Sequence, residues 1–177
     1  TGIGLRDRKH LTTLSVLSTI LGGNMSSRLF ISIRERQGLC YVIHSSVNPY
    51  VDTGTLMIQA GVDNTRVEPA IIAIIGELRK IKDELVSVEE LRDAKTCLAG
   101  QTALKLEDSA ALAGFYGKQS VLLGTLHSPK ERLVAINQVT REDIRRLARR
   151  LLHLPLLNIA SIGPQQSLNH VRSDLAL

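Results

Sequence analysis

The sequence predicts a two-layer α+β domain in which a mostly antiparallel sheet is covered on one face by helices. Strand-like segments lie together early in the chain, and segments with helical spacing follow one another after residue 65. The 177 residues are 44% hydrophobic and 22% charged, which is the mixture of a folded globular domain. We therefore expect residues 1–177 to form a single domain, with residues 164–177 as a polar tail.

Two helices and a strand pair are expected first. Leucines at helical spacing predict a helix over residues 9–21, which ends at a pair of glycines. A second helix is expected from residues 24–26 to Gly38, a typical C-terminal capping residue. Residues 41–47 and 55–62 are extended runs joined by a stretch rich in turn formers, so they predict an antiparallel pair.

Capping boxes mark the helices that follow, because a hydroxyl residue three positions before an acid satisfies free N–H groups at a helix start. Such pairs are Thr65 with Glu68, Ser87 with Glu90, Ser128 with Glu131, and the weaker Thr140 with Asp143. A helix over residues 109–123 contains Gly114 and Gly117, which are typical of close packing. Residues 156–162 predict a short buried strand.

The net charge of +5 is compatible with an acidic partner, but its distribution argues against nucleic acid. Basic residues concentrate at 130–150, where apolar residues at helical spacing place most arginines on the outer face of a helix. Aromatic residues, which stack on bases, make up only 3%. No apolar run approaches the roughly 18 residues of a spanning helix, and residues 1–10 do not resemble a secretory leader. We expect no nucleic-acid or membrane partner, and a soluble, cytoplasmic protein if the source is bacterial.

Common catalytic and metal motifs are missing from the sequence. Cys40 and Cys97 form no C-x-x-C pair and are expected to be small core residues. The histidines are isolated, and neither H-E-x-x-H nor H-x-x-E-H occurs. His127 lies four residues before Glu131, but that glutamate is better explained by its capping box. The sequence therefore predicts no metal site in this chain.

Arg34 and Tyr41 are the remaining candidates for a site. With about 100° per residue in a helix, Arg34 falls between Phe30 and Ile31, off the polar arc. Its guanidinium must either reach solvent or project over a packed surface. Tyr41 starts the strand after Gly38 and is expected at the same end of the sheet. A guanidinium and a phenol together offer donors to a carbonyl or an oxyanion; the alternative is a purely structural pair.

Three segments carry a family resemblance: residues 21–30 (LGGNMSSRLF), 33–41 (IRERQGLCY) and 50–54 (YVDTG). Together they resemble the C-terminal half of the pitrilysin family of zinc peptidases, which includes insulin-degrading enzyme and the mitochondrial processing peptidases. Shorter matches follow at residues 87–91, 139–144 and 162–164, so the resemblance covers nearly the whole chain. It implies two similar α+β halves that close around a chamber, with zinc held by an H-x-x-E-H motif in the N-terminal half.

The resemblance sets the functional expectations. This chain resembles the metal-free half, so we expect no catalytic residue and no bound cofactor in it, with zinc in the N-terminal half. Arg34 and Tyr41 are implied to bind the scissile region of a peptide substrate and to help stabilise the tetrahedral intermediate. The implied partner is a zinc-binding half or subunit. The strand that precedes such a half is expected to be truncated before residue 1. The alternative function is a non-catalytic subunit that pairs with a zinc-bearing partner.

Overall fold

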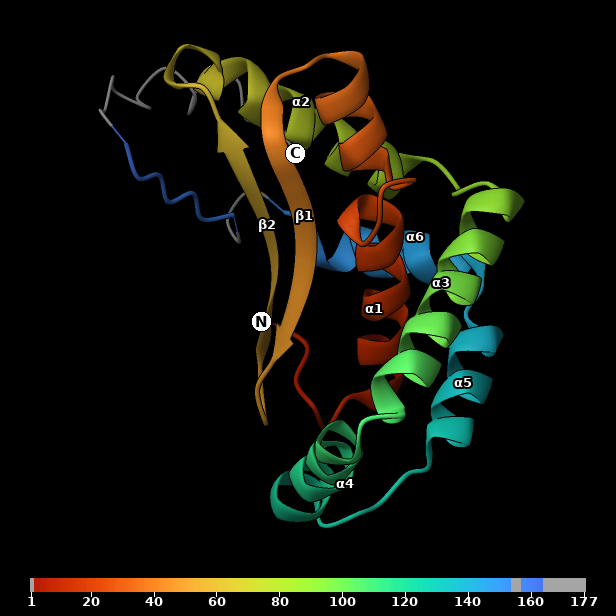
Figure 1. Cartoon of the computed structure of the whole chain (residues 1–177). Coiled ribbons are helices and arrows are strands. Elements are labelled where there is room, and N and C mark those ends of the chain that lie inside the picture. Colours follow the sequence, from red (N-terminus) through yellow and green to blue (C-terminus); the bar gives the residue numbers. More distant parts are fainter. Residues whose placement is uncertain (1, 154–156, 164–177) are drawn as a thin grey trace.

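The computed structural model describes residues 2–153 and 157–163, and it confirms an α+β fold (Figure 1). Helices make up most of it, with one strand pair near the start. In chain order the elements are α1 (Arg8–Gly22), the π-helix η1 (Phe30–Arg36), β1 (Cys40–Pro49), β2 (Gly54–Val62), the 3-10 helix η2 (Asn64–Arg66), α2 (Val67–Asp83), α3 (Val88–Leu106), α4 (Ser109–Leu123), α5 (Pro129–Gln138) and α6 (Arg141–Leu151).

The sheet is an antiparallel hairpin with helices on one of its faces, as the sequence predicts. Pro49 pairs with Gly54 at the turn, and Cys40 pairs with Val62 at the open end. Helix α1 lies between this hairpin and α3 (Figure 1). Ile43 and Ser45 of β1 are buried, whereas His44 between them is exposed on the other face. The alternation of side chains along the strand thus separates a core face from an open face.

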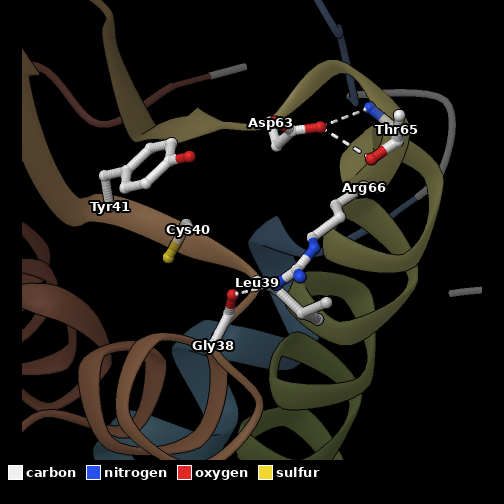
Figure 2. A pocket seen from close by; sticks show the side chains of 7 residues that line it. All are labelled: Gly38, Leu39, Cys40, Tyr41, Asp63, Thr65 and Arg66. Atoms are coloured by element: carbon white, nitrogen blue, oxygen red, sulfur yellow. Dashed lines mark hydrogen bonds between the residues drawn. The ribbon is translucent and has the colours of Figure 1, made fainter.

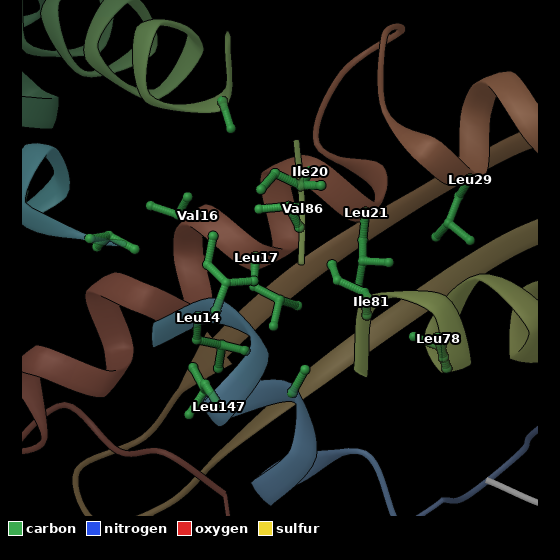
Figure 3. Close-up of a cluster of buried hydrophobic side chains, with 14 of the residues drawn as sticks. Leu14, Val16, Leu17, Ile20, Leu21, Leu29, Leu78, Ile81, Val86 and Leu147 are labelled. Carbon is green, nitrogen blue, oxygen red and sulfur yellow. The ribbon is translucent and has the colours of Figure 1, made fainter. Parts of the chain in front are cut away.

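Helix α1 is the centre of the core. Its buried side chains include Val16, Leu17 and Leu21, which belong to one cluster with side chains of α2 and α6 and with Leu29, the residue before η1 (Figure 3). Each large apolar side chain buried in this way contributes about 1.5–3 kcal/mol. The buried hydroxyls of Ser18 and Ser45 lie 2.9 Å apart and hydrogen-bond, so α1 is joined to β1 by a satisfied polar contact as well.

Three of the predicted capping boxes are present, at Ser87, Ser128 and Thr140. The box predicted at Thr65 with Glu68 is wrong. Asp63 lies two residues earlier, and its Oδ1 accepts from the N–H (2.9 Å) and the hydroxyl (2.6 Å) of Thr65. The Thr65 hydroxyl is therefore already used, and the chain makes a turn of 3-10 helix before α2 begins at Val67.

Three smaller expectations need correction. Residues 157–162 form no strand and Ile162 is fully exposed, since the described sheet offers this segment no partner; Leu156 and the tail 164–177 lie outside the described residues. Helix α4 forms as predicted, but an added Cβ at either glycine would meet open space, so these glycines do not mark close packing. Cys40 is buried, while Cys97 is only half-buried.

The solvent face of α6 is arginine-rich, as expected, over a buried side of Ile144, Leu147 and Ala148. Two of these arginines connect α6 to the end of α2 and the residues after it. Arg149 Nε donates to the Lys82 carbonyl at 3.1 Å, and Arg141 donates to the Val86 carbonyl. Among the described helices, none combines the length and the apolar character required to span a membrane.

Candidate substrate-contact site

The helix that carries Arg34 is a π-helix, not the α-helix that the sequence predicts. Helical backbone begins at Arg28, and Phe30–Arg36 has the wider π turn. Leu29 and Ile33 are fully buried, four residues apart, and anchor the inner side of this segment. The wider turn changes the angle between successive side chains, so the arcs expected for an α-helix do not apply here. Single π turns are frequent at functional sites.

Arg34 lies over the ring of Phe30, with its guanidinium carbon 4.6 Å from the ring centroid. This is a cation–π contact. Its Nη1 is also 3.6 Å from Glu35 Oε1, and 39% of the side chain is exposed. The guanidinium is therefore held against the helix that carries it while one side stays accessible, which corresponds to the first of the two alternatives, a side chain that reaches solvent.

Gly38 ends the helix as predicted and turns the chain into β1. Its φ is +59°, in the left-handed region that favours glycine. The Gly38 N–H donates to the Arg34 carbonyl (3.2 Å), and the Leu39 N–H donates to the Ile33 carbonyl (3.0 Å). The backbone of Arg34 is thus tied directly to the turn that leads to Tyr41.

Tyr41 occupies a β-bulge at the start of β1. Cys40 pairs with Val62 and Val42 pairs with Gly61, which leaves Tyr41 without a partner in the strand register. Tyr41 and Val42 are consequently both exposed, between the buried Cys40 and Ile43, and Tyr41 is 74% exposed. A bulge re-aims a side chain that regular alternation would place differently. Here it leaves the phenol free on the molecular surface.

A hollow of about 360 Å³ lies beside Tyr41 (Figure 2). It is lined by Gly38, Leu39, Cys40, Tyr41, Asp63, Thr65 and Arg66. These residues come from two places in the chain, the η1–β1 turn and the β2–α2 connection, which face one another at the open end of the hairpin. Burial raises the pKa of the Cys40 thiol, an effect that the nearby Arg34 charge opposes. The thiol is therefore protonated and a poor nucleophile at neutral pH.

The predicted pair lies at one end of the sheet without direct contact. No hydrogen bond, ion pair or ring contact joins Arg34 to Tyr41 in the part of the chain that the structure describes. Arg34 does not line the hollow, although its charge acts on Cys40, the neighbour of Tyr41. Both side chains are accessible from solvent.

A second arginine fixes the start of the helical segment. Arg28 donates from Nε to Glu90 Oε1 (2.6 Å) and from Nη2 to Glu90 Oε2 (2.9 Å), a bidentate pair between residues 62 positions apart. Glu90 also accepts from the Ser87 N–H at 2.8 Å, which completes its capping box. The hydrogen bond from Arg28 is the main cause that holds the pKa of Glu90 below its ordinary value. Sequence reasoning found the capping box but not this pair.

Potential metal ligands are scattered. Over residues 2–153 and 157–163, no group of three or more His, Cys, Asp or Glu side chains is arranged to hold a metal ion. His127 Nδ1 lies 3.8 Å from Glu131 Oε1, and Glu131 serves the capping box of α5.

The fold defines a class of protein, an α+β domain with helices on one face of an antiparallel sheet. The sequence profile of the peptidase M16 inactive domain matches residues 2–98. The chain belongs to this family, which confirms the resemblance to zinc peptidases.

Curated relatives carry the name zinc protease and are much longer than this chain. An uncharacterized zinc protease of Streptomyces coelicolor is 36% identical over 152 residues, which cover 85% of this chain and 33% of the relative. One of Mycobacterium leprae is 34% identical over 162 residues, covering 92% of this chain and 36% of the relative. The chain thus spans about one third of the length of these relatives.

Solved structures have the same fold. A conserved protein from Enterococcus faecalis superposes with a TM-score of 0.73 at 27% identity, covering 80% of this chain and 33% of that one. A peptidase M16 inactive domain from Pseudomonas fluorescens gives a TM-score of 0.76 at 24% identity, covering 86% of this chain and 36% of that one.

Proposed function

We propose that this chain is the metal-free, substrate-binding half of a zinc metalloendopeptidase that cleaves peptides in a chamber closed by an N-terminal zinc-bearing half. Zinc-activated water in that other half attacks the peptide bond. From this half, Arg34 and Tyr41 contact the peptide beside the scissile bond. The Tyr41 hydroxyl and the Arg34 guanidinium supply donors to the carbonyl oxygen as negative charge develops on it.

The observation that carries this proposal is the accessibility of Tyr41 next to the hydrogen-bonded turn at Gly38. A tyrosine used only for packing would bury its ring, whereas the bulge leaves this one 74% exposed. Arg34 is fixed over Phe30 and through the backbone bonds to Gly38, so its donors are oriented before a ligand arrives. Preorganised donors of this kind cost little reorganisation during the reaction.

The alternative is a non-catalytic subunit that pairs with a zinc-bearing partner. The lengths of the relatives favour the first function, because the chain matches about one third of proteins that are each named zinc protease. The gene upstream of residue 1 separates the two functions. An H-x-x-E-H motif in the same reading frame supports a single-chain peptidase, and its absence supports a separate partner.

We also propose that a strand precedes residue 1 and joins this sheet. The first described residues already run beside the hairpin: the Leu5 N–H donates to the Tyr50 carbonyl at 2.7 Å, and Ile3 is buried in the core. Residues upstream would therefore approach β2. Within the described residues the outer edge of β2 has no strand beside it.

The proposal is tested by peptide turnover in the complete peptidase, assembled with its zinc-bearing half. Tyr41→Phe removes one donor and is expected to lower kcat about 100-fold, as the loss of one oxyanion-hole donor does. Arg34→Ala is expected to lower kcat/KM by at least as much. The unfolding midpoints of both variants should stay close to that of the wild type, since both side chains are partly or largely exposed.

A matched control separates the site from a general effect of surface tyrosines. Tyr50 is 60% exposed at the hairpin turn, where its backbone hydrogen-bonds to Leu5 and Thr53. Tyr50→Phe makes the same chemical change away from the hollow and should leave turnover unchanged. Equal rates for Tyr41→Phe and the wild type would refute the assignment.

A further inference from the structure

Arg66, which follows β2, hydrogen-bonds to the turn that joins Arg34 to Tyr41. Its Nη1 donates to the carbonyl of Gly38 at 2.7 Å, across 28 residues of chain (Figure 2). In the described part of the chain the Gly38 carbonyl accepts a hydrogen bond from the Arg66 guanidinium and from no other side chain. The contact lies on the wall of the hollow that Tyr41 also lines. Sequence spacing gives no signal for it, since the two residues share neither a helix nor a strand.

Arg66 is itself held in place by its own turn. The Arg66 N–H donates to the Asp63 carbonyl (2.9 Å), and the Asp63 side chain fixes Thr65 through two further hydrogen bonds. Asp63 follows Val62, the last residue of β2 and the partner of Cys40. The backbone position of Arg66 is thus set by the end of β2, to which Asp63 is joined.

The bulge explains why such a contact matters at this point. Next to the Cys40–Val62 pair the register skips Tyr41, so the regular ladder does not fix the direction of the first strand residues. The neighbouring Gly38 has a positive φ and, as a glycine, a backbone that can adopt many other conformations. An arginine that holds the Gly38 carbonyl restrains the chain between these two irregular positions.

We propose that Arg66 is a positioning residue for Tyr41: its hydrogen bond to the Gly38 carbonyl sets the direction in which β1 begins and so the place of the phenol relative to Arg34. This inference rests on the proposed function, in which Tyr41 contacts the peptide. Arg66 acts through the turn, and its loss is expected to affect kcat more than KM, because misplacing a transition-state donor leaves ground-state binding largely intact.

The test is a double-mutant cycle in the complete peptidase. Arg66→Met keeps an unbranched apolar stem but removes the donor, and it should lower kcat about fivefold, the scale of one hydrogen bond. In a Tyr41→Phe background the same substitution should cause no further loss, because the hydroxyl that Arg66 positions is already absent. Arg150→Met is the control: it removes the same charge from an exposed site on α6 and should leave kcat unchanged.

The outcomes separate the two proposals. A fivefold loss from Arg66→Met that persists in the Tyr41→Phe background would overturn the positioning role, and so would an unchanged kcat in the single variant; either leaves the Tyr41 assignment standing. If Tyr41→Phe itself has no effect, the proposed function fails and the positioning role fails with it. If Arg66→Met lowers kcat only when Tyr41 is present, and Tyr41→Phe lowers kcat by itself, both the proposed function and the positioning role are supported.

Discussion

The helices of residues 87–151 and the segment of residues 28–49 are held by different kinds of contact. The first region starts its helices with side chains that bond three residues away, as at Ser87, Ser128 and Thr140. The second region is held from far along the chain: Arg28 by Glu90, Gly38 by Arg66 and Ser45 by Ser18. It also contains the π-helix, the left-handed glycine and the bulge.

The geometry of the candidate site therefore depends on contacts with residues far away in the sequence. A local cap fixes where a helix begins, so substitutions of the capping residues act mainly on stability. The irregular segment has the geometry that its distant partners impose, so substitutions of those partners are expected to move Tyr41 and Arg34. Irregular backbone of this kind persists only where the surroundings over-determine it.

The largest expected effect comes from the buried anchor of the irregular segment. Ile33 is completely buried below η1, and Ile33→Ala should destabilise the fold by about 2–5 kcal/mol through lost burial and a new cavity. Urea unfolding followed by circular dichroism measures this free energy. Ile72→Ala on α2, where the side chain is 48% exposed, is the matched control and should cost far less. Similar losses for both would show that η1 is not part of the cooperative core.

The next effect is that of the Arg28–Glu90 pair. Glu90→Gln removes one charge from a partly buried bidentate pair and leaves Arg28 with a poorer partner, which should cost about 2 kcal/mol, less than for a fully buried pair. Glu68→Gln makes the same change at an exposed glutamate in the first turn of α2, which forms no capping box, and should cost at most about 0.5 kcal/mol through its charge at the helix N-terminus. A loss at Glu68 as large as that at Glu90 would contradict the assignment of the larger cost to the Arg28 pair.

The same pair predicts a pH dependence. Because the pKa of Glu90 is lower in the folded protein than in the unfolded chain, the unfolded state binds more protons as the pH falls. The contribution of Glu90 to the free energy of unfolding is complete above the pKa of glutamate in the unfolded chain, about 4.3. It is lost as the pH falls through the pKa of Glu90 in the folded protein. The difference in unfolding free energy between the wild type and Glu90→Gln should therefore be constant above about pH 5.5 and shrink below pH 4. A difference that grows on acidification would contradict this linkage.

Gly38 gives a smaller effect with a clear sign. A Cβ at this position would meet only Arg66 Nη1, at 4.0 Å, so Gly38→Ala causes no clash and its cost is the left-handed backbone alone, about 1.5 kcal/mol. Gly100→Ala on α3 also places a methyl group in open space, but in an ordinary helical conformation. It should stabilise by up to about 1 kcal/mol. Chemical denaturation of both variants tests the opposite signs.

The contrast between the two regions also sets what the sequence can predict. Helix starts at Ser87, Ser128 and Thr140 are encoded in residues three positions apart, and the Gly38 stop is encoded in one residue. The placement of Tyr41 is not encoded so locally, because the bulge depends on the register against β2. The Thr65 box fails for a similar reason, since a carboxylate two residues earlier competes for its hydroxyl.

The smallest effect belongs to the regular region. Ser128→Ala removes the hydroxyl that accepts from the Glu131 N–H at 3.2 Å and should destabilise by about 1 kcal/mol. Ser120→Ala lies inside α4, where alanine is the better helix former, and should be neutral or slightly stabilising. Peptide turnover in the complete peptidase should be unchanged in both, because the hydrogen bonds of the Ser128 side chain lie within its own capping box. A loss of turnover in Ser128→Ala at intact stability would mean that this local cap does act on the η1–β1 turn.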